Sequence, residues 1–245
     1  MSGEFPYLDE SQRFEFPPHD AATADGIVAV GGNLSPGMLL SAYRQGIFPW
    51  YSSEDPILWW CPDPRFVLEP QQLHVPRRLE RFLRNDPFSY SMDSRFGEVV
   101  HACRHAARPG QDGTWISAEI VDGYTRLHQL GYAHSLEVLL QGELVGGLYG
   151  VAIGSVFFGE SMFARCSDAS KAGLVRLVQL LERNGFRLID CQVYTRHLER
   201  FGATEMPREL FLQLLESLVR QRTQRGSWSH ISVLETAVSD ELAQN

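Results

Sequence analysis

A carboxylate and a carboxamide two residues apart are the side chains of this sequence whose types and spacing most directly suggest chemistry. Asp190 and Gln192 lie in the apolar run 187–193, which predicts a short strand. Side chains alternate along a strand, so we expect these two to share one face. The carboxamide could donate to a developing oxyanion, and the carboxylate could hold it or accept a proton from an amine. The plain alternative for Asp190 is a structural role at the end of the strand.

This pair would suit acyl transfer to an amine. An α-amino group has a pKa of about 7.7 to 8.0, so roughly a tenth or more of it is already neutral and nucleophilic at pH 7. Catalysis then needs positioning and only a weak base. A serine hydrolase is not expected at Ser161, because Phe163 stands where the second glycine of a nucleophile elbow would be.

Three consecutive strands are predicted ahead of this pair, in the stretch 134–163. The runs 135–140 and 144–151 flank the turn signal Gln141-Gly142, and a third run begins at Val156. Glycines inside the second run would weaken it unless a bulge, a neighbouring backbone or a substrate needs the space. A helix over about 167–184 follows. The predicted unit is an antiparallel meander, a helix and the strand that carries Asp190 and Gln192.

The region before residue 67 is rich in proline, glycine and aromatic residues and predicts a small separate domain. Ser35 and Pro36 have the types of an N-cap and a first helical residue. The large aromatics between residues 47 and 60 could form a compact core, or a wall that stacks on a ring or a base. We therefore expect a small N-terminal α/β domain at 1–66, a main domain at 67–222 and a C-terminal tail at 223–245.

A row of arginines marks the segment that follows this boundary. The pattern of 76–84 predicts a helix with one apolar stripe, and the opposite face carries Arg77, Arg81 and Arg84. A solvated helix face is one interpretation. Phosphate contact is the other, because Glu80 is the only acidic residue from His74 to Arg84.

Composition limits the remaining classes of function. The net charge of −8 argues against wholesale coating by nucleic acid, although a local basic patch can coexist with it. The four cysteines are far apart and no secretion signal is visible, which indicates a reducing cytosol. No apolar run approaches the roughly 18 to 20 residues that cross a bilayer. His101, Cys103 and His105 lack the second ligand group that zinc would need, so no metal is expected.

Seven stretches of the sequence, in register from about residue 26 to 207, resemble the leucyl/phenylalanyl-tRNA–protein transferases, bacterial enzymes of the N-end rule degradation pathway. They read GGNLSPGMLLSAYRQGIFPWY, DPILWWCPDPR, GTWIS, AHSLEV, LVGGLYGVAIGSVFFGESMF, SDASKAGL and LIDCQV. The resemblance implies an α+β protein, with a small N-terminal domain and a GNAT-like (acetyltransferase-like) domain whose mainly antiparallel sheet is flanked by helices. It also implies transfer of leucine or phenylalanine from tRNA to the α-amino group of proteins that begin with Arg or Lys, without cofactor, ATP or metal.

The resemblance also assigns roles to positions. Asp190 and Gln192 match the catalytic pair, with Gln192 as proton acceptor or orienting group and Asp190 polarising it; the RNA's own hydroxyl remains an alternative acceptor. Leu177 stands where an aromatic ring is expected, which would widen the pocket. The resemblance implies three groups of substrate-binding positions. Aromatic walls for the terminal adenosine are Trp50 and Trp115, and the apolar pocket for the leucyl or phenylalanyl side chain is Leu148, Phe157, Leu177 and Ile189. The remaining positions near the substrate are Gly159, Glu160 and Ser170.

Two other functions stay open on the sequence. An acyl-CoA N-acetyltransferase would need a glycine-containing loop around the pyrophosphate, but the stretch 163–169 has no glycine and contains Asp168. A non-catalytic tRNA- or peptide-binding module would keep the arginine row without needing Asp190 and Gln192 together. The expected partners are Leu-tRNA, Phe-tRNA and proteins with N-terminal Arg or Lys, and we expect a cytoplasmic monomer that does not associate with membranes.

Overall fold

Two sheets organise the part of the chain that the computed structural model describes, residues 5–52, 54–106 and 116–234. The small antiparallel sheet has the order β1-β3-β2, formed by Ile27–Val30, Leu58–Trp60 and Phe48–Pro49. The large sheet has the order β10-β4-β9-β8-β7-β6-β5. In chain order its strands are β4 (Arg65–Leu68), β5 (Ser89–Met92), β6 (Ala133–Leu140), β7 (Glu143–Ile153), β8 (Val156–Ala164), β9 (Leu188–Gln192) and β10 (Thr204–Met206).

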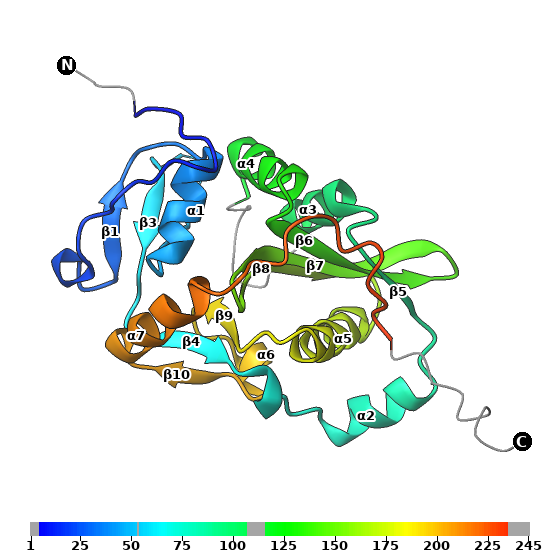
Figure 1. Cartoon of the computed structure of the whole chain (residues 1–245). Helices are drawn as coiled ribbons and strands as arrows, with labels where there is room; N and C mark the ends of the chain where they lie inside the picture. Colours follow the sequence, from blue (N-terminus) through cyan, green and yellow to red (C-terminus); the bar gives the residue numbers. More distant parts are fainter. Residues whose placement is uncertain (1–4, 53, 107–115, 235–245) are drawn as a thin grey trace, which may run out of the picture.

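Helices cover both faces of the large sheet, as Figure 1 shows. On one face lie α3 (Phe96–His105) and α4 (Ala118–Gln129), and on the other lies α5 (Ala169–Arg183). All strand pairs are antiparallel except β8 and β9, which α5 connects. The expected α+β architecture, a mainly antiparallel sheet flanked by helices beside a small N-terminal unit, is confirmed. The remaining elements are η1 (His19–Ala21), α1 (Pro36–Arg44), η2 (Pro70–Gln72), α2 (Arg77–Arg84), α6 (Arg196–Glu199) and α7 (Arg208–Val219).

The predicted meander is present as β6, β7 and β8. The third strand is longer than its apolar run suggested, since β8 continues to Ala164 and so includes Glu160. Gly150 lies where the register between β7 and β8 shifts. A Cβ atom on this glycine would approach the carbonyl oxygen of Phe158 to 2.2 Å and the ring of Phe157 to 2.5 Å. A bulge and a tightly packed neighbour therefore require this glycine.

The chain passes from the small sheet to the large one between Trp60 and Arg65. Because β4 begins at Arg65 and pairs with β9 and β10, residues 65 and 66 already belong to the large sheet. The division of the chain into 1–66, 67–222 and 223–245 remains a prediction.

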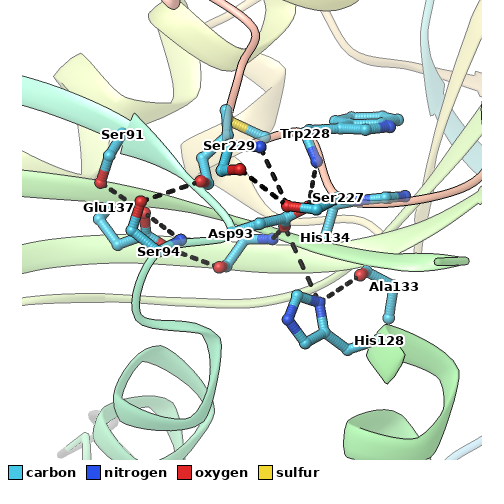
Figure 2. Close-up of polar contacts among 12 residues, drawn as sticks. Ser91, Asp93, Ser94, His128, Ala133, His134, Glu137, Ser227, Trp228 and Ser229 are labelled. Carbon is cyan, nitrogen blue, oxygen red and sulfur yellow. Dashed lines mark hydrogen bonds and ion pairs between the residues drawn. The ribbon is translucent and has the colours of Figure 1, made fainter. Parts of the chain in front are cut away.

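The first part of the C-terminal tail packs on the large sheet, although its sequence showed no pattern. Trp228 is buried and stacks on His134 with ring centroids 3.7 Å apart. Its backbone N–H donates to Asp93 Oδ2 over 2.7 Å, and Asp93 also pairs with Nδ1 of His134 at 2.9 Å. Figure 2 shows this cluster beside a second one, in which Ser91 donates to the buried carboxylate of Glu137. The described tail thus closes over one edge of the meander.

A buried ion pair between β4 and β9 joins the large sheet to the small unit. Arg65 on β4 donates through Nε and Nη2 to the two carboxylate oxygens of Asp190 on β9, over 2.8 and 2.6 Å. Both side chains are 0% exposed. The guanidinium carbon lies 4.7 Å from the ring centre of Phe48 in β2 and 4.7 Å from that of Phe211 in α7. The pair is therefore held where β4, β9, the small sheet and α7 meet.

Removal of Asp190 should destabilise the whole protein. In Asp190→Ala the guanidinium of Arg65 stays buried without its counter-ion, a change that typically costs about 3 to 5 kcal/mol. We expect that loss in the free energy of unfolding measured by urea titration. Glu216→Ala, which removes the exposed partner of Arg220, is the control and should cost less than about 1 kcal/mol. Equal midpoints and slopes for Asp190→Ala and the wild type would contradict the role given to the pair.

Candidate active site

A cavity of about 320 Å³ lies between β7, β8 and β9, the middle of α5, the helix α6 and the edge of the small sheet. Most of the side chains that line it are apolar, and two of its polar side chains, Glu160 and Gln192, are hydrogen-bonded to each other. Residues that the sequence analysis assigned to the site make up much of its wall: Trp50, Leu148, Phe157, Gly159, Glu160, Leu177, Ile189 and Gln192. The structure therefore brings together most of the predicted positions from elements far apart in the sequence.

The other predicted residues lie elsewhere. Asp190 is fully buried behind the wall, paired with Arg65, and Ser170 on the first turn of α5 does not line the cavity. Trp115 lies outside the described residues. The arginine row is exposed on α2, which lies along the outer edge of the molecule in Figure 1: Arg77, Arg81 and Arg84. The roles of all these residues stay predictions.

The apolar end of the cavity is built by strand alternation. Leu148 on β7, Phe157 on β8 and Ile189 on β9 point to the face that α5 covers, and Leu177 on α5 meets them. Each of the four side chains is at most 5% exposed. Such a wall suits an unbranched or branched hydrocarbon side chain or a phenyl ring, because burial of apolar area is its main source of affinity. Leu174, one turn before Leu177, also contributes to the wall and was not predicted.

The polar end is a carboxylate enclosed by three donors. Tyr43 of α1 donates to Glu160 Oε1 over 2.6 Å, and Tyr124 of α4 donates to Oε2 over 2.8 Å. The two phenol oxygens are also in contact, but each phenol has one O–H, so they can hydrogen-bond to each other only when one of them does not donate to Glu160. Gln192 completes the set by donating from Nε2 to Oε1 over 2.9 Å. Glu160 therefore connects β8 by hydrogen bonds to the small N-terminal unit, to α4 and to the end of β9.

This environment changes the proton affinity of Glu160. Burial disfavours the charged form and raises the pKa to about 7, with a contribution from nearby Asp190, whereas the three hydrogen bonds lower it. The carboxyl group is consequently close to half-protonated at neutral pH. A group with a pKa near 7 at the wall of a cavity is characteristic of functional sites.

Gln192 is held in an unusual backbone conformation. Its φ of +67° lies in the left-handed region, which costs a residue with a side chain on the order of 1 kcal/mol or more. Its backbone N–H donates to Asp190 Oδ1 over 2.9 Å, and its carboxamide nitrogen donates to Glu160. The predicted pairing of Asp190 with Gln192 thus runs through the backbone, and the carboxamide nitrogen is turned toward Glu160.

Sequence reasoning missed three polar residues that hold this arrangement: Arg65, Tyr43 and Tyr124. The two tyrosines sit in ordinary amphipathic helices, and nothing local distinguishes them from core residues. Arg65 did leave a signal, since it is a single charge at the head of the apolar run Phe66–Leu68. A lone charge beside a buried strand usually has a buried partner.

No metal or membrane site is found in the described part of the chain. Within residues 5–52, 54–106 and 116–234, no group of three or more His, Cys, Asp or Glu side chains is arranged to hold a metal ion. None of the helices within those ranges has the length and apolar character to cross a membrane.

The raised pKa of Glu160 predicts a pH-dependent stability. Its pKa is about 7 in the folded protein against 4.5 for the ordinary side chain, so folding favours the protonated form. The contribution of this group to the free energy of unfolding is fully present below about pH 4.5 and is lost as the pH rises through 7. The loss between pH 5 and 8 is about 2 to 3 kcal/mol. Urea titrations of the wild type and Glu160→Gln at both pH values measure it. The stability advantage of the wild type over the variant should fall by that amount, and a difference that is constant with pH would contradict the prediction.

Comparisons with known proteins agree with this geometry. A family model described as leucyl/phenylalanyl-tRNA protein transferase matches residues 67–216, and the model of that family's N-terminal domain matches residues 32–63. The first covers the large sheet from within β4 onward and the cavity lining except residues 48–50, and the second covers α1, β2 and β3.

Full-length relatives carry the same name. A leucyl/phenylalanyl-tRNA–protein transferase of Syntrophus aciditrophicus is 54% identical over 214 residues, which is 87% of this chain and 90% of that protein. One of Myxococcus xanthus is 51% identical over 229 residues, which is 94% of this chain and 95% of that protein. A solved GCN5-related N-acetyltransferase from Kribbella flavida overlaps 71% of this chain and 62% of its own at 16% identity and a TM-score of 0.36, too low to carry an argument. By its family models and its relatives, this chain belongs to the leucyl/phenylalanyl-tRNA–protein transferases and is an aminoacyltransferase that moves an aminoacyl group from tRNA to proteins.

Proposed function

We propose that this enzyme transfers leucine or phenylalanine from tRNA to the α-amino group of proteins that begin with Arg or Lys, and so marks them for N-end rule degradation in the cytoplasm. The observation that carries the proposal is the apolar cavity whose polar end is formed by Gln192 and Glu160. Its apolar wall suits the side chain of leucine or phenylalanine. The aminoacyl ester would then lie with its carbonyl group at the polar end.

The reaction forms an amide bond and breaks an ester bond. The amine nitrogen of the acceptor attacks the carbonyl carbon, and the bond from that carbon to the ribose oxygen breaks. One proton must pass from the amine to the departing oxygen, directly or through a neighbouring group. Because the α-amino group has a pKa of about 8, roughly a tenth of it is already neutral and nucleophilic at pH 7, so the protein has mainly to orient the two reactants.

Gln192 and Asp190 have different parts in this proposal. Gln192 lines the cavity and is the group that contacts the amine or the carbonyl oxygen. Asp190 is fully buried, so it acts as a positioning residue that fixes the backbone of Gln192 while it neutralises Arg65. Glu160 orients the carboxamide through its hydrogen bond with Nε2. Trp50, whose ring lies 5.5 Å from that of Trp60, would offer a flat wall to the terminal adenosine.

The alternatives raised by the sequence are less consistent with these findings. Family membership favours aminoacyl transfer over acetyl transfer from CoA. A module that only binds would not need the strained Gln192 held by two carboxylates.

Transfer of labelled leucine tests the proposal directly. Purified Leu-tRNA is offered with a peptide that starts with Arg and, separately, with one that starts with Ala. We expect label on the Arg peptide only, and a loss of about 100- to 1000-fold in kcat for Gln192→Ala, as for removal of an oxyanion donor. Gln213→Ala, an exposed glutamine on α7, is the matched control and should behave as the wild type. Equal labelling of both peptides would refute the acceptor preference, and no labelling with bound tRNA would refute the reaction.

The arginine row of α2 is the proposed contact with the acceptor stem. Phosphate contacts position a nucleic acid without reading its bases, and each contact steepens the salt dependence of binding. Arg77→Ala combined with Arg81→Ala should therefore weaken binding of every Leu-tRNA alike and reduce the slope of log K against log salt by about 1 to 2. Filter binding at several salt concentrations measures the slope. A slope equal to that of the wild type would exclude the row.

A further inference from the structure

A second groove adjoins the aminoacyl cavity. It lies between the start of α2, the first turn of α5 and the helix α6, with a volume of about 750 Å³. His197 lines both spaces, so the groove and the cavity meet at this residue. Polar and charged side chains dominate the lining of the groove: His74, Arg78, Ser167, Asp168, Lys171, His197, Glu199 and Arg200.

Three separate segments contribute one permanent cation each to this groove: Arg78, Lys171 and Arg200. Two acidic residues also line it. Asp168 accepts from Nζ of Lys171 over 2.6 Å, and Glu199 accepts from the phenol of Tyr194 over 2.9 Å. An excess of positive charge therefore remains in a chain whose net charge is −8.

The cations lie close enough to act on common neighbours. The pKa of His197 is lowered by burial first, and then by the positive charges of Lys171 and Arg200. The pKa of Asp168 is lowered mainly by its hydrogen bond from Lys171, with a contribution from the charge of Arg78. The positive potential is thus concentrated in one place, which attracts an anion more strongly than scattered charges would.

Two further features face the groove. The 15-residue helix α5 begins here, and its N-cap Asp168 has a left-handed backbone and makes no side-chain cap. The positive end of the helix dipole therefore faces the groove and favours an anion there, while the first N–H of the helix, that of Ala169, donates to the carbonyl oxygen of Cys166 over 3.4 Å. In addition, the buried Nε2 atom of His197 has no hydrogen-bond partner among the described residues.

The walls of the groove are fixed to each other. The backbone N–H of His74 donates to the carbonyl oxygen of Phe201 over 2.9 Å. Gly202 packs so tightly against the Gln72 carbonyl oxygen that a Cβ atom would lie 2.4 Å from it. A preformed site loses less free energy to ordering when a ligand binds.

We propose that this groove binds the phosphate that joins the terminal adenosine of aminoacyl-tRNA to the preceding nucleotide, with Lys171 and Arg200 as its principal ligands. The inference rests on the proposed function, since it takes the aminoacyl adenosine to occupy the adjoining cavity. The RNA strand would pass from that adenosine, past His197, into the groove. Each nucleotide of the strand carries a phosphate, so the first one next to the adenosine would lie there. The row of Arg77, Arg81 and Arg84 on α2 remains for phosphates farther from the 3′ end.

Binding of short RNA pieces tests the groove without the reaction. The trinucleotide CpCpA and adenosine are titrated against the wild type, against Lys171→Gln with Arg200→Gln, and against a control with Arg220→Gln and Arg222→Gln, two exposed arginines near the end of α7. We expect the wild type and the control to prefer the trinucleotide by about 10-fold or more, as for one charge-assisted hydrogen bond. The groove variant should lose this preference, while its affinity for adenosine stays unchanged. The slope of log K against log salt for the trinucleotide should fall by about 0.7 for each phosphate contact that is lost.

Three results would overturn the assignment. The first is a groove variant that prefers the trinucleotide over adenosine as strongly as the wild type does. The second is a groove variant that loses affinity for adenosine as well as for the trinucleotide. The third is a changed KM for the Arg peptide with intact trinucleotide binding, which would assign the groove to the acceptor peptide. The proposed function fails separately: a wild type that prefers the trinucleotide but transfers no leucine would keep the phosphate site and refute the transferase.

Discussion

The arrangement of this molecule depends on one buried ion pair. Arg65 and Asp190 are both removed from water, so each needs the other at short range and in a fixed orientation. The pair spans β4 and β9, and its guanidinium lies between Phe48 of the small sheet and Phe211 of α7. Movement of any of these elements would expose or separate two charges in an apolar interior. The end of β9, where Gln192 enters the cavity, is fixed by this requirement.

The two carboxylates near the cavity show how environment separates the roles of similar groups. Asp190 faces a guanidinium and supplies a permanent charge behind the wall. Glu160 faces two phenols and a carboxamide, none of which carries a charge to balance its own. Burial then favours its neutral form, and a pKa of about 7 follows. The permanent charge of Asp190 thus holds the strands together, while the exchangeable proton of Glu160 lies at the wall of the cavity.

How far the sequence could predict this structure depended on the range of the interactions. The meander, the helix α5 and the strand β9 were predicted because apolar periodicity and turn residues are local signals. The assignment of Leu148, Phe157 and Ile189 to one pocket came from the family resemblance, and in the structure all three line the same cavity. By contrast, Tyr43 meets Glu160 across 117 positions, and no local pattern reports such a contact. Trp228 was missed for a related reason, since one aromatic residue in a polar tail has no period.

The position of β4 in the large sheet has a consequence for how the protein folds during its synthesis. Arg65 precedes its partner Asp190 by 125 positions, and β4 lies between β9 and β10, which are both made far later in the chain. Closing so long a loop is slow compared with forming the meander, whose strands are neighbours in sequence. The meander can therefore assemble on a growing polypeptide well before the cavity is complete. Incomplete translation products would carry the sheet's hairpins but no activity, so only a finished polypeptide can label other proteins.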